Sequence, residues 1–598
     1  MIAANKNIVK RERILPDMLY SDIATVFDRI EGTGSRLEMT SILSQLFGTL
    51  DPVSLRDVVY LSQGKLRPDF HPQKLGMSDK LVLKAISMTS GFSETDTEKL
   101  WVKEGDPGTV AELLIKEKKQ TALFSERLTL DRVMKNLRLI ESSDGKDSRE
   151  RKMKLLANLL HDSGSIEARY LCRIVTGRMR VGAGSMTILD ALASSFSDKS
   201  DRPEIERAFN ITCDMGKVAE ILASGGMDAI RSVSVEMNSP IKVMLAERMP
   251  SMAGIMERME GKCAMEYKYD GIRVQAHITK DDVILYSRRL EDMTKNFPDI
   301  AASLKNALIG NETIVEGECV SVDVRSGKML PFQEVTHRRR KHGMEDAVKD
   351  YPVKIFLFDI LQRDGTDITM FPYLKRRELL ASSFAEHENI EVSYMKVVES
   401  VDEAEEFFSE ALAKGCEGIM AKSVSDASVY RAGSRGFLWI KYKKDYRSDM
   451  TDSFDLAVAG AFYGMGKRKG RYGALLMASY DNEMQCYTTI CKLGTGFDDA
   501  FLDSMPELLD KYKSIEKPAN VHSNMIPDVW FDPSVVLEVT GAELSLSPIH
   551  TAAFGVFKED AGVGIRFPRF TGRVRDDKSP EESTGVGEII EMYEMQNG

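Results

Sequence analysis

The chain has 598 residues, of which 43% are hydrophobic and 29% are charged, an ordinary composition for a globular protein. This length predicts two to four domains. No run of about eighteen apolar residues occurs, so no membrane span is predicted, and a formal net charge of −11 argues against indiscriminate polyanion binding. Seven scattered cysteines without a Cys-x-x-Cys pair indicate a reducing compartment and no structural zinc.

Residues 1–18 precede the first helical pattern. Their charges follow a short apolar start, and they lack the apolar core of a secretory signal, so we expect an N-terminal extension or tail. Because no targeting signal is seen, the expected location is the cytoplasm.

Residues 19–238 are predicted to be helical. Apolar residues recur there at helical spacing, beginning with Ile23, Val26, Phe27 and Ile30. Ser21 or Asp22 can cap this first helix, since both types accept hydrogen bonds from first-turn amides.

A glycine-rich stretch interrupts the helical region at residues 177–184 (GRMRVGAG). Its glycines let backbone amides and guanidinium groups approach phosphates closely. Arg178, Arg180 and Gly182 are therefore candidate nucleic-acid contacts. An ordinary loop between helices is the alternative interpretation.

A second stretch, from Gln120 to Phe124, reads Gln-Thr-Ala-Leu-Phe. Gln-x-x-Leu-Phe resembles a shortened sliding-clamp binding motif. A helix start with two apolar core residues explains the same spacing.

Residues 239–446 alternate strands with helices. Residues 265–273 (MEYKYDGIR) read as strand, turn and strand, with Asp270-Gly271 at the turn. Glu266 and Lys268 share one face of the first strand, and Arg273 opens the partner strand. A lysine with a carboxylate beside it and an arginine across a turn suits nucleophilic attack on a phosphate. The alternative is a surface hairpin with a solvated lysine.

Further strands follow in this region. One runs into Ser287-Arg288, and residues 313–320 place Glu316 and Glu318 on one face. Residues 354–360, which include Phe358, form an apolar run typical of a buried strand. The predicted helix at 402–414 has Asp402 at its start. Two more strands are predicted at 417–422, beginning with Glu417, and at 439–443, with Lys441 and Lys443 on one face.

From about residue 447 the chain consists of short strands and turns, which predicts a small all-β barrel. Cations are concentrated at 338–341, 467–471 and 566–575. Any one cluster is explained by a solvated face, but several in an acidic chain indicate a charged inner surface.

The ordered set of these stretches resembles the motifs of covalent nucleotidyltransferases. Lys268-x-Asp-Gly-x-Arg273, Glu316-Gly-Glu318, Phe358-Asp359, Glu417-Gly-Ile-Met-Ala-Lys422 and Lys441-Tyr-Lys443 come in the family's order, and Arg575-Asp-Asp-Lys578 is similar to its last motif. With the 178–192 stretch, the chain resembles ATP-dependent DNA ligases of the archaeal and eukaryotic type.

The resemblance implies a multidomain α+β protein. It implies an all-α DNA-binding domain at 19–238, an α+β adenylation domain at 239–446 and an all-β OB-fold at 447–598. The implied activity is nick sealing in double-stranded DNA through a lysyl-AMP and a DNA-adenylate, acting in replication, repair and recombination. The implied cofactors are ATP and Mg²⁺ or another divalent cation, and we expect a monomer.

The resemblance also implies roles for single residues. Lys268 is the nucleophile that accepts AMP. A lysine amine is protonated at neutral pH and must lose its proton to attack, which burial and nearby cations favour. The implied ATP-binding residues are Glu266 on the adenine, Phe358 on the purine face, Glu318 on the ribose, and Arg273, Arg288, Arg435, Lys441 and Lys443 on the phosphates.

Glu417, assisted by Glu318, is the implied metal site, since Mg²⁺ prefers oxygen ligands and keeps several waters. Arg575 and Lys578 are implied to orient pyrophosphate in the first step. The family's archaeal members carry a clamp motif in the loop region of Gln120 and Phe124.

Two rival classes remain from the sequence. An RNA ligase or mRNA-capping guanylyltransferase shares the lysine motif but needs no helical first domain. A non-catalytic nucleic-acid scaffold with a degenerate nucleotide site would retain its activity after Lys268→Ala. An NAD⁺-dependent ligase would be expected to carry a four-cysteine zinc site, which the sequence lacks.

Overall fold

The computed structural model describes residues 18–71, 75–119, 126–323, 325–338, 344–443, 453–464 and 470–597. The chain divides into two compact units, one ending at Lys441 and one beginning at Tyr442. The stretch from Gln120 to Phe124 lies outside the described residues. Within them, no helix has both the length and the apolar character that crossing a membrane requires.

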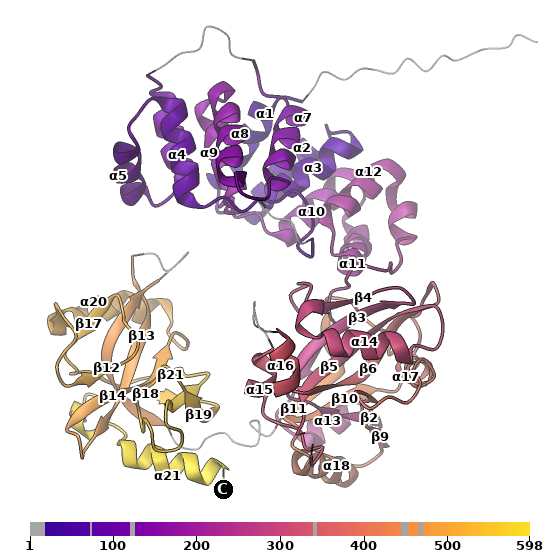
Figure 1. Cartoon of the computed structure of the whole chain (residues 1–598), viewed down its shortest axis with the longest axis vertical. Coiled ribbons are helices and arrows are strands. Elements are labelled where there is room, and N and C mark those ends of the chain that lie inside the picture. The colour runs from indigo at the N-terminus through magenta and orange to yellow at the C-terminus, as the bar shows by residue number, and fades with distance from the viewer. Residues whose placement is uncertain are drawn as a thin grey trace, which may run out of the picture. The chain divides into compact units, whose positions relative to one another are not determined.

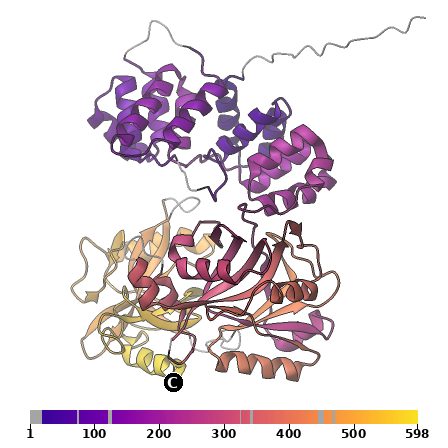
Figure 2. The same cartoon turned by 45° about the vertical axis from the view of Figure 1, so that its right-hand side comes forward.

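The first unit opens with a region built of helices (Figure 2). Side-chain caps set several of the helix starts, as where Asp51 accepts from the amides of Val53 and Ser54. The first cap was predicted wrongly, because the helix begins at Tyr20 and Ser21 and Asp22 lie inside its first turn. The helices are α1 Tyr20–Glu31, α2 Arg36–Phe47, α3 Pro52–Ser62, α4 Asp79–Ser90, α5 Glu94–Glu104, α6 Pro107–Lys116, α7 Leu130–Glu141, α8 Ser148–Asp162, α9 Ser165–Val175, α10 Ser185–Phe196, α11 Arg202–Thr212 and α12 Met215–Arg231.

Two β-sheets form the rest of the first unit. One has the strand order β1-β11-β10-β2-β9, and the other has the order β4-β3-β5-β6-β7 with β8 paired to β6. The strands are β1 Leu245–Arg248, β2 Cys263–Lys268, β3 Ile272–Thr279, β4 Val283–Ser287, β5 Glu312–Ser321, β6 Val353–Arg363, β7 Thr366–Asp367, β8 Ile390–Val392, β9 Met395–Val398, β10 Gly418–Ser423 and β11 Arg435–Lys443.

Strands β2 and β3 do not form the predicted hairpin. They lie in different sheets, and the chain crosses from one sheet to the other at Asp270-Gly271. The alternation of side chains predicted both strands correctly but carried no information about their partners. Glycine is required at the crossing, because a Cβ on Gly271 would lie 2.4 Å from the carbonyl oxygen of Cys319 on β5.

Helices cover these sheets. The helix predicted at 402–414 is α18, and its cap is Ser400, whose side chain accepts from the Glu403 amide, so the prediction of Asp402 was wrong by two residues. The helices of this region are α13 Met252–Arg258, α14 Pro298–Ala307, α15 Phe332–Thr336, α16 Met344–Asp350, α17 Tyr373–Ala381 and α18 Val401–Ala413.

The segment that joins the helical region to the sheets is held by side chains of β3. The Ile241 amide donates to Gln275 Oε1 at 2.7 Å, and the Asn238 amide donates to His277 Nδ1 at 3.1 Å. The helical side contributes as well, since the Lys242 amide donates to the carbonyl of Asn210 at 2.8 Å. This junction is therefore a packed structure with its own hydrogen bonds.

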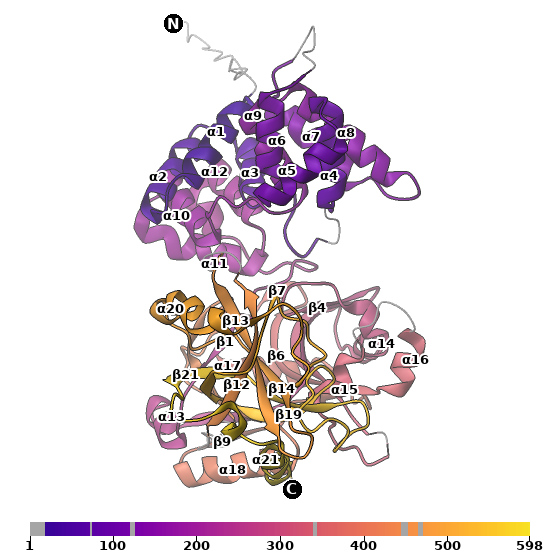
Figure 3. The same cartoon turned by 90° about the vertical axis from the view of Figure 1, so that its left-hand side faces the viewer.

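The second unit is rich in β-strands, with α20 and α21 at opposite ends of them (Figure 1, Figure 3). Its main sheet has the order β15-β17-β12-β13-β14-β16, with β18 joining β12 to β21, and β19 pairs with β20. The strand pattern predicted neither helix. The elements are β12 Phe454–Tyr463, β13 Tyr472–Asp481, β14 Cys486–Leu493, α20 Asp499–Leu509, β15 Lys513–Ser514, β16 Val521–His522, β17 Val529–Phe531, β18 Val536–Thr540, β19 Glu543–Ser547, β20 Gly562–Arg566, β21 Arg569–Val574 and α21 Val586–Asn597.

Candidate active site

The predicted nucleophile lies at the end of β2. β2 pairs antiparallel with β10, which sets Lys268 opposite Gly418 and Glu266 opposite Met420. Glu417 directly precedes β10, and its carboxylate accepts a hydrogen bond from the Lys268 ammonium. Both side chains are about one-fifth exposed, so the ion pair lies in a sheltered position that solvent still reaches.

Glu266 lies deeper on the same face of β2, in a fully buried polar cluster. The ammonium of Lys422 lies 2.7 Å from its carboxylate, and Arg377 lies 3.4 Å away. The hydroxyl of Tyr373 donates to the same carboxylate. Burial lowers the pKa of Lys422, and the charges of Glu266 and Asp359 oppose that shift. The cluster fixes the carboxylate predicted to read adenine.

Phe358 on β6 lies next to this cluster and is half-buried. The Arg273 guanidinium and the Lys422 ammonium each lie 5.2 Å from its ring centre. The ring also meets Trp439 of β11 edge-on at 6.3 Å. Phe358 thus packs against a hydrophobic cluster that includes Trp439 and also has cations beside its ring.

Arg273 is engaged by protein groups. Its guanidinium donates to Glu316 at 2.8 Å and to the carbonyl of Met244 at 3.1 Å. Glu316 is completely buried and also accepts from the Tyr430 hydroxyl at 2.9 Å. The predicted phosphate ligand is therefore held by a buried carboxylate that the sequence alone did not identify as its partner.

Glu318 lies directly across from Arg273 in the pairing of β3 with β5. Burial raises the pKa of Glu318 to about 7, and the positive charges of Lys268 and Arg273 oppose the shift. The carboxyl group can therefore change its charge near neutral pH.

Cations gather around Lys441 of β11. Burial lowers the pKa of Lys441, and so do the nearby charges of Lys268, Arg435, Arg288 and Arg248. Arg248 ends β1 directly opposite Lys441 and was not predicted as a site residue. Lys443 lies two positions further along β11. The structure thus brings Arg288, Arg435 and Lys441 together beside Lys268, a concentration of cations that suits a polyphosphate.

The donor set fits a magnesium ion. No cluster of three or more His, Cys, Asp or Glu groups suited to a metal occurs among the described residues. Mg²⁺ needs only one or two carboxylates when water and substrate phosphates supply the remaining ligands. Glu417 pairs with Lys268, and Lys268 acts electrostatically on Glu318, so both predicted carboxylates adjoin the nucleophile.

The predicted DNA-contact loop lies on the surface of the helical region. Arg178 is 56% exposed and lies 3.1 Å from Asp79. Arg180 has a positive φ of 58° and donates to the Gly105 carbonyl at 3.3 Å. Gly182 also has a positive φ, of 75°. Both arginines are exposed, in a loop that contains glycines with positive φ values, a conformation that favours glycine.

The residues of the last motif lie in the second unit. Arg575 and Lys578 both bind the same oxygen of Asp455, at 2.6 and 2.7 Å. Asp577 also pairs with Arg575, at 2.7 Å. The second carboxylate oxygen of Asp455 is buried without a hydrogen-bond partner among the described residues. Asp455 thus holds both cations of the last motif and was not predicted from the sequence.

Three family models match the chain in sequence order. They describe the DNA ligase N terminus at residues 19–193, the ATP dependent DNA ligase domain at 243–443 and the ATP dependent DNA ligase C terminal region at 468–578. The chain belongs to the ATP-dependent DNA ligase family, as the order of its motifs predicted.

Named relatives match over nearly the whole chain. DNA ligase 2 of Thermofilum pendens is 47% identical, and a DNA ligase of Sulfolobus acidocaldarius is 42% identical, each over 97% of this chain and 98% of the relative. A probable DNA ligase of Aquifex aeolicus is 44% identical over 97% of this chain and 99% of its own. A solved structure titled Pmar-Lig_Pre has a TM-score of 0.54 at 16% identity, covering 93% of this chain and 99% of that one, which supports the fold alone.

Proposed function

We propose that Lys268 is the residue through which this ATP-dependent DNA ligase takes up AMP. The observation that carries the proposal is the position of Lys268 at the end of β2, paired with Glu417 and close to the cations around Lys441. These cations offset the negative charge of a phosphate bound beside Lys268.

In the first step the Lys268 amine, after losing a proton, attacks the α-phosphorus of ATP. A phosphorus–nitrogen bond forms, the bond to the β-phosphate oxygen breaks, and pyrophosphate leaves. Glu266 accepts from the adenine amine, Phe358 lies on the purine and Glu318 holds the ribose. Arg273, Arg288, Arg435, Lys441 and Lys443 bind the phosphates, since in-line displacement at phosphorus depends on positioning and charge neutralisation.

Glu417, with Glu318, would hold Mg²⁺, which when bound neutralises phosphate charge. In the second step the 5′-phosphate of a nick attacks the lysyl-AMP phosphorus and displaces Lys268. In the third step the 3′-hydroxyl attacks that 5′-phosphorus, and AMP leaves. We assign replication, repair and recombination as the settings for this chemistry, with the chain acting as a cytoplasmic monomer on nicked double-stranded DNA.

The proposed domains are the DNA-binding domain at 19–238, the adenylation domain at 239–446 and the OB-fold at 447–598, after an extension at 1–18. Arg178, Arg180 and Gly182 contact the DNA backbone. Arg575 and Lys578 orient pyrophosphate in the first step.

A sliding clamp is a further proposed partner, bound through the stretch from Gln120 to Phe124. Support comes from the Gln-x-x-Leu-Phe sequence. Phe124→Ala should abolish retention of the chain on immobilised clamp, with Phe92→Ala as an aromatic control outside the motif. Equal retention of wild type and Phe124→Ala would refute this partner.

The test of the central proposal is incubation with α-labelled ATP and Mg²⁺, followed by denaturing electrophoresis. Wild type should carry the label and Lys268→Ala should not, while Lys349→Ala, which removes an exposed lysine of α16 outside the site, should still be labelled. Protein purified with AMP already attached is first stripped with pyrophosphate. Label on Lys268→Ala would overturn the assignment, and transfer to nicked RNA in preference to nicked DNA would overturn the substrate.

A further inference from the structure

A second groove lies on the other face of the strand that carries the nucleophile. Side chains alternate along β2, so Tyr267 points away from the face that Glu266 and Lys268 share. Tyr267 and Tyr269 line a groove of about 860 Å³ together with Phe356 and Tyr394. The active-site strand thus forms a wall of two separate sites.

The aromatic side chains of this groove are pre-arranged. Tyr269 stacks on Phe356 with ring centres 4.1 Å apart and planes 13° apart. Tyr394 lies 5.0 Å from Tyr267 and remains 48% exposed. A fixed ring with an exposed face is the feature that single-stranded nucleic-acid sites use to stack an unpaired base.

Lysines accompany these rings. Lys328, Lys354 and Lys414 line the groove with the carboxylates Glu391 and Glu410. Glu391 is paired with Lys354 at 2.6 Å, and Glu410 accepts from the Tyr267 hydroxyl at 2.6 Å. Neither Lys328 nor Lys414 has an ion pair within the described part of the chain. Their ammonium groups are the ones suited to a phosphate.

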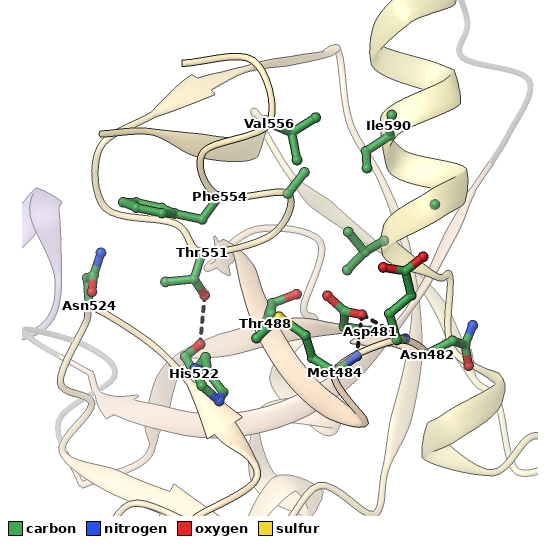
Figure 4. Close-up of a pocket in the computed structure, with 14 residues that line it drawn as sticks. Asp481, Asn482, Met484, Thr488, His522, Asn524, Thr551, Phe554, Val556 and Ile590 are labelled. Carbon is green, nitrogen blue, oxygen red and sulfur yellow. Dashed lines mark hydrogen bonds between the residues drawn. The ribbon is translucent and has the colours of Figure 1, made fainter. Parts of the chain in front are cut away.

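A groove in the second unit has a lining of the opposite charge (Figure 4). It holds about 680 Å³ and has apolar Phe554, Val556 and Ile590 beside polar His522, but its charged lining residues are Asp481 and Glu483. No lysine or arginine is among the described residues that line it. An acidic groove does not suit a phosphate, whereas the groove behind β2 combines rings with lysines.

We propose that the groove behind β2 binds an unpaired nucleotide, with its base against Tyr394 and its phosphate against Lys328 and Lys414. The same chemistry is offered by a nucleotide in a single-stranded segment of DNA and by a free mononucleotide. Of these we assign the strand segment, because both lysines are exposed to solvent and leave room for the chain to continue beyond them.

The test uses the full chain with AMP already attached, so that the active site is filled. The probe is a 5′-phosphorylated trinucleotide with 2-aminopurine at its centre, whose fluorescence falls on stacking. Tyr394→Ala should weaken its binding about five-fold to more than a hundred-fold, the range for one lost base stack. Tyr394→Phe keeps the ring and should bind as wild type does, which separates ring loss from misfolding.

Lys328→Ala should reduce the slope of log affinity against log salt by about 0.7, the value for one phosphate contact on a single strand. Lys349→Ala, which removes an exposed lysine of α16 outside the groove, should leave the slope unchanged. If AMP displaces the probe as readily as unlabelled trinucleotide does, the ligand is a free mononucleotide and the assignment of a strand segment is overturned.

Unchanged binding in both Tyr394→Ala and Lys328→Ala would overturn the site itself. The inference extends the DNA ligase function but does not depend on Lys268. Labelling of the same variants with ATP, expected at the wild-type level, reports separately on the adenylation chemistry.

Discussion

Single residues of the candidate active site have shifted pKa values. Glu318 has an ordinary carboxyl pKa of 4.5 that burial raises to about 7. Below about pH 4.5 the group is neutral in the folded and unfolded chain alike. Between that value and pH 7 the unfolded chain ionises first, so the stability that this group contributes is lost as pH rises through the folded pKa.

We therefore expect Glu318→Gln to melt at nearly the wild-type temperature at pH 5 and above it at pH 8, since the amide carries no charge to bury. Calorimetry of the ligand-free chain across this range measures the difference. Glu388→Gln, which changes an exposed carboxylate, is the control. A melting difference that stays constant with pH would contradict the expectation.

The buried pair of Glu266 and Lys422 yields a second prediction at this scale. Lys422→Met should lower the free energy of unfolding by about 3–5 kcal/mol, because it leaves a carboxylate buried without its closest cation. The double variant with Glu266→Gln should lose less than the sum of the two single losses. Urea denaturation of all four proteins completes the cycle, and strict additivity would show that the pair is not coupled.

The sequence predicted part of this pocket. Alternation along one strand was enough to put Glu266 and Lys268 on a common face, and motif order supplied Lys441. Lys422 was recognised only as the end of a motif and was given no role, and Arg248 was missed. A lysine late in a strand and an arginine at the end of a short strand look like surface residues until cross-strand pairing is known. The burial of Glu316 beside Arg273 likewise depends on tertiary packing, which the sequence pattern does not show.

Among the elements, the crossing from β2 to β3 depends on a close approach of two backbone segments. Gly271→Ala should destabilise the fold by about 1–3 kcal/mol, the usual cost of overpacking, because its Cβ would collide with the Cys319 carbonyl oxygen on β5. Gly436→Ala on β11 is the matched control, since a Cβ there meets no atom within 4 Å. Equal urea midpoints for the two variants would show that the crossing can move aside.

The elements themselves were predicted better than their partners. The strand predicted at 313–320 matches β5 to within one residue at each end, whereas the apolar run at 354–360 and the strand at 439–443 are parts of the longer β6 and β11. The division into two sheets was not visible in these patterns. α20 was missed because its start depends on Asp498, which accepts from the Phe501 amide in a region otherwise full of strand signals.

At the scale of the whole molecule, the last motif lies in a different unit from Lys268. Lys578→Ala should slow self-adenylation about ten- to a hundred-fold, the value of one charge-assisted contact to pyrophosphate. Its sealing of pre-adenylated nicks should stay near wild type. Single-turnover assays of both steps measure this, and a variant that adenylates normally but seals poorly would refute the role.

Asp455→Asn serves as the companion variant, because it keeps both cations but removes the carboxylate that holds them. It should slow self-adenylation less than Lys578→Ala does. A larger effect would mean that Asp455, rather than the cations, sets the rate.

The junction around residues 238–242 has a practical consequence for dividing this protein. Gln275 and His277 belong to the same strand as Arg273, and their side chains accept hydrogen bonds from amides of the joining segment. An expression fragment that starts at residue 243 would remove the hydrogen bonds that Gln275 and His277 make to Ile241 and Asn238, two and four residues from Arg273. A catalytic fragment should therefore begin upstream of Val235, so that the strand keeps the neighbours that fix it.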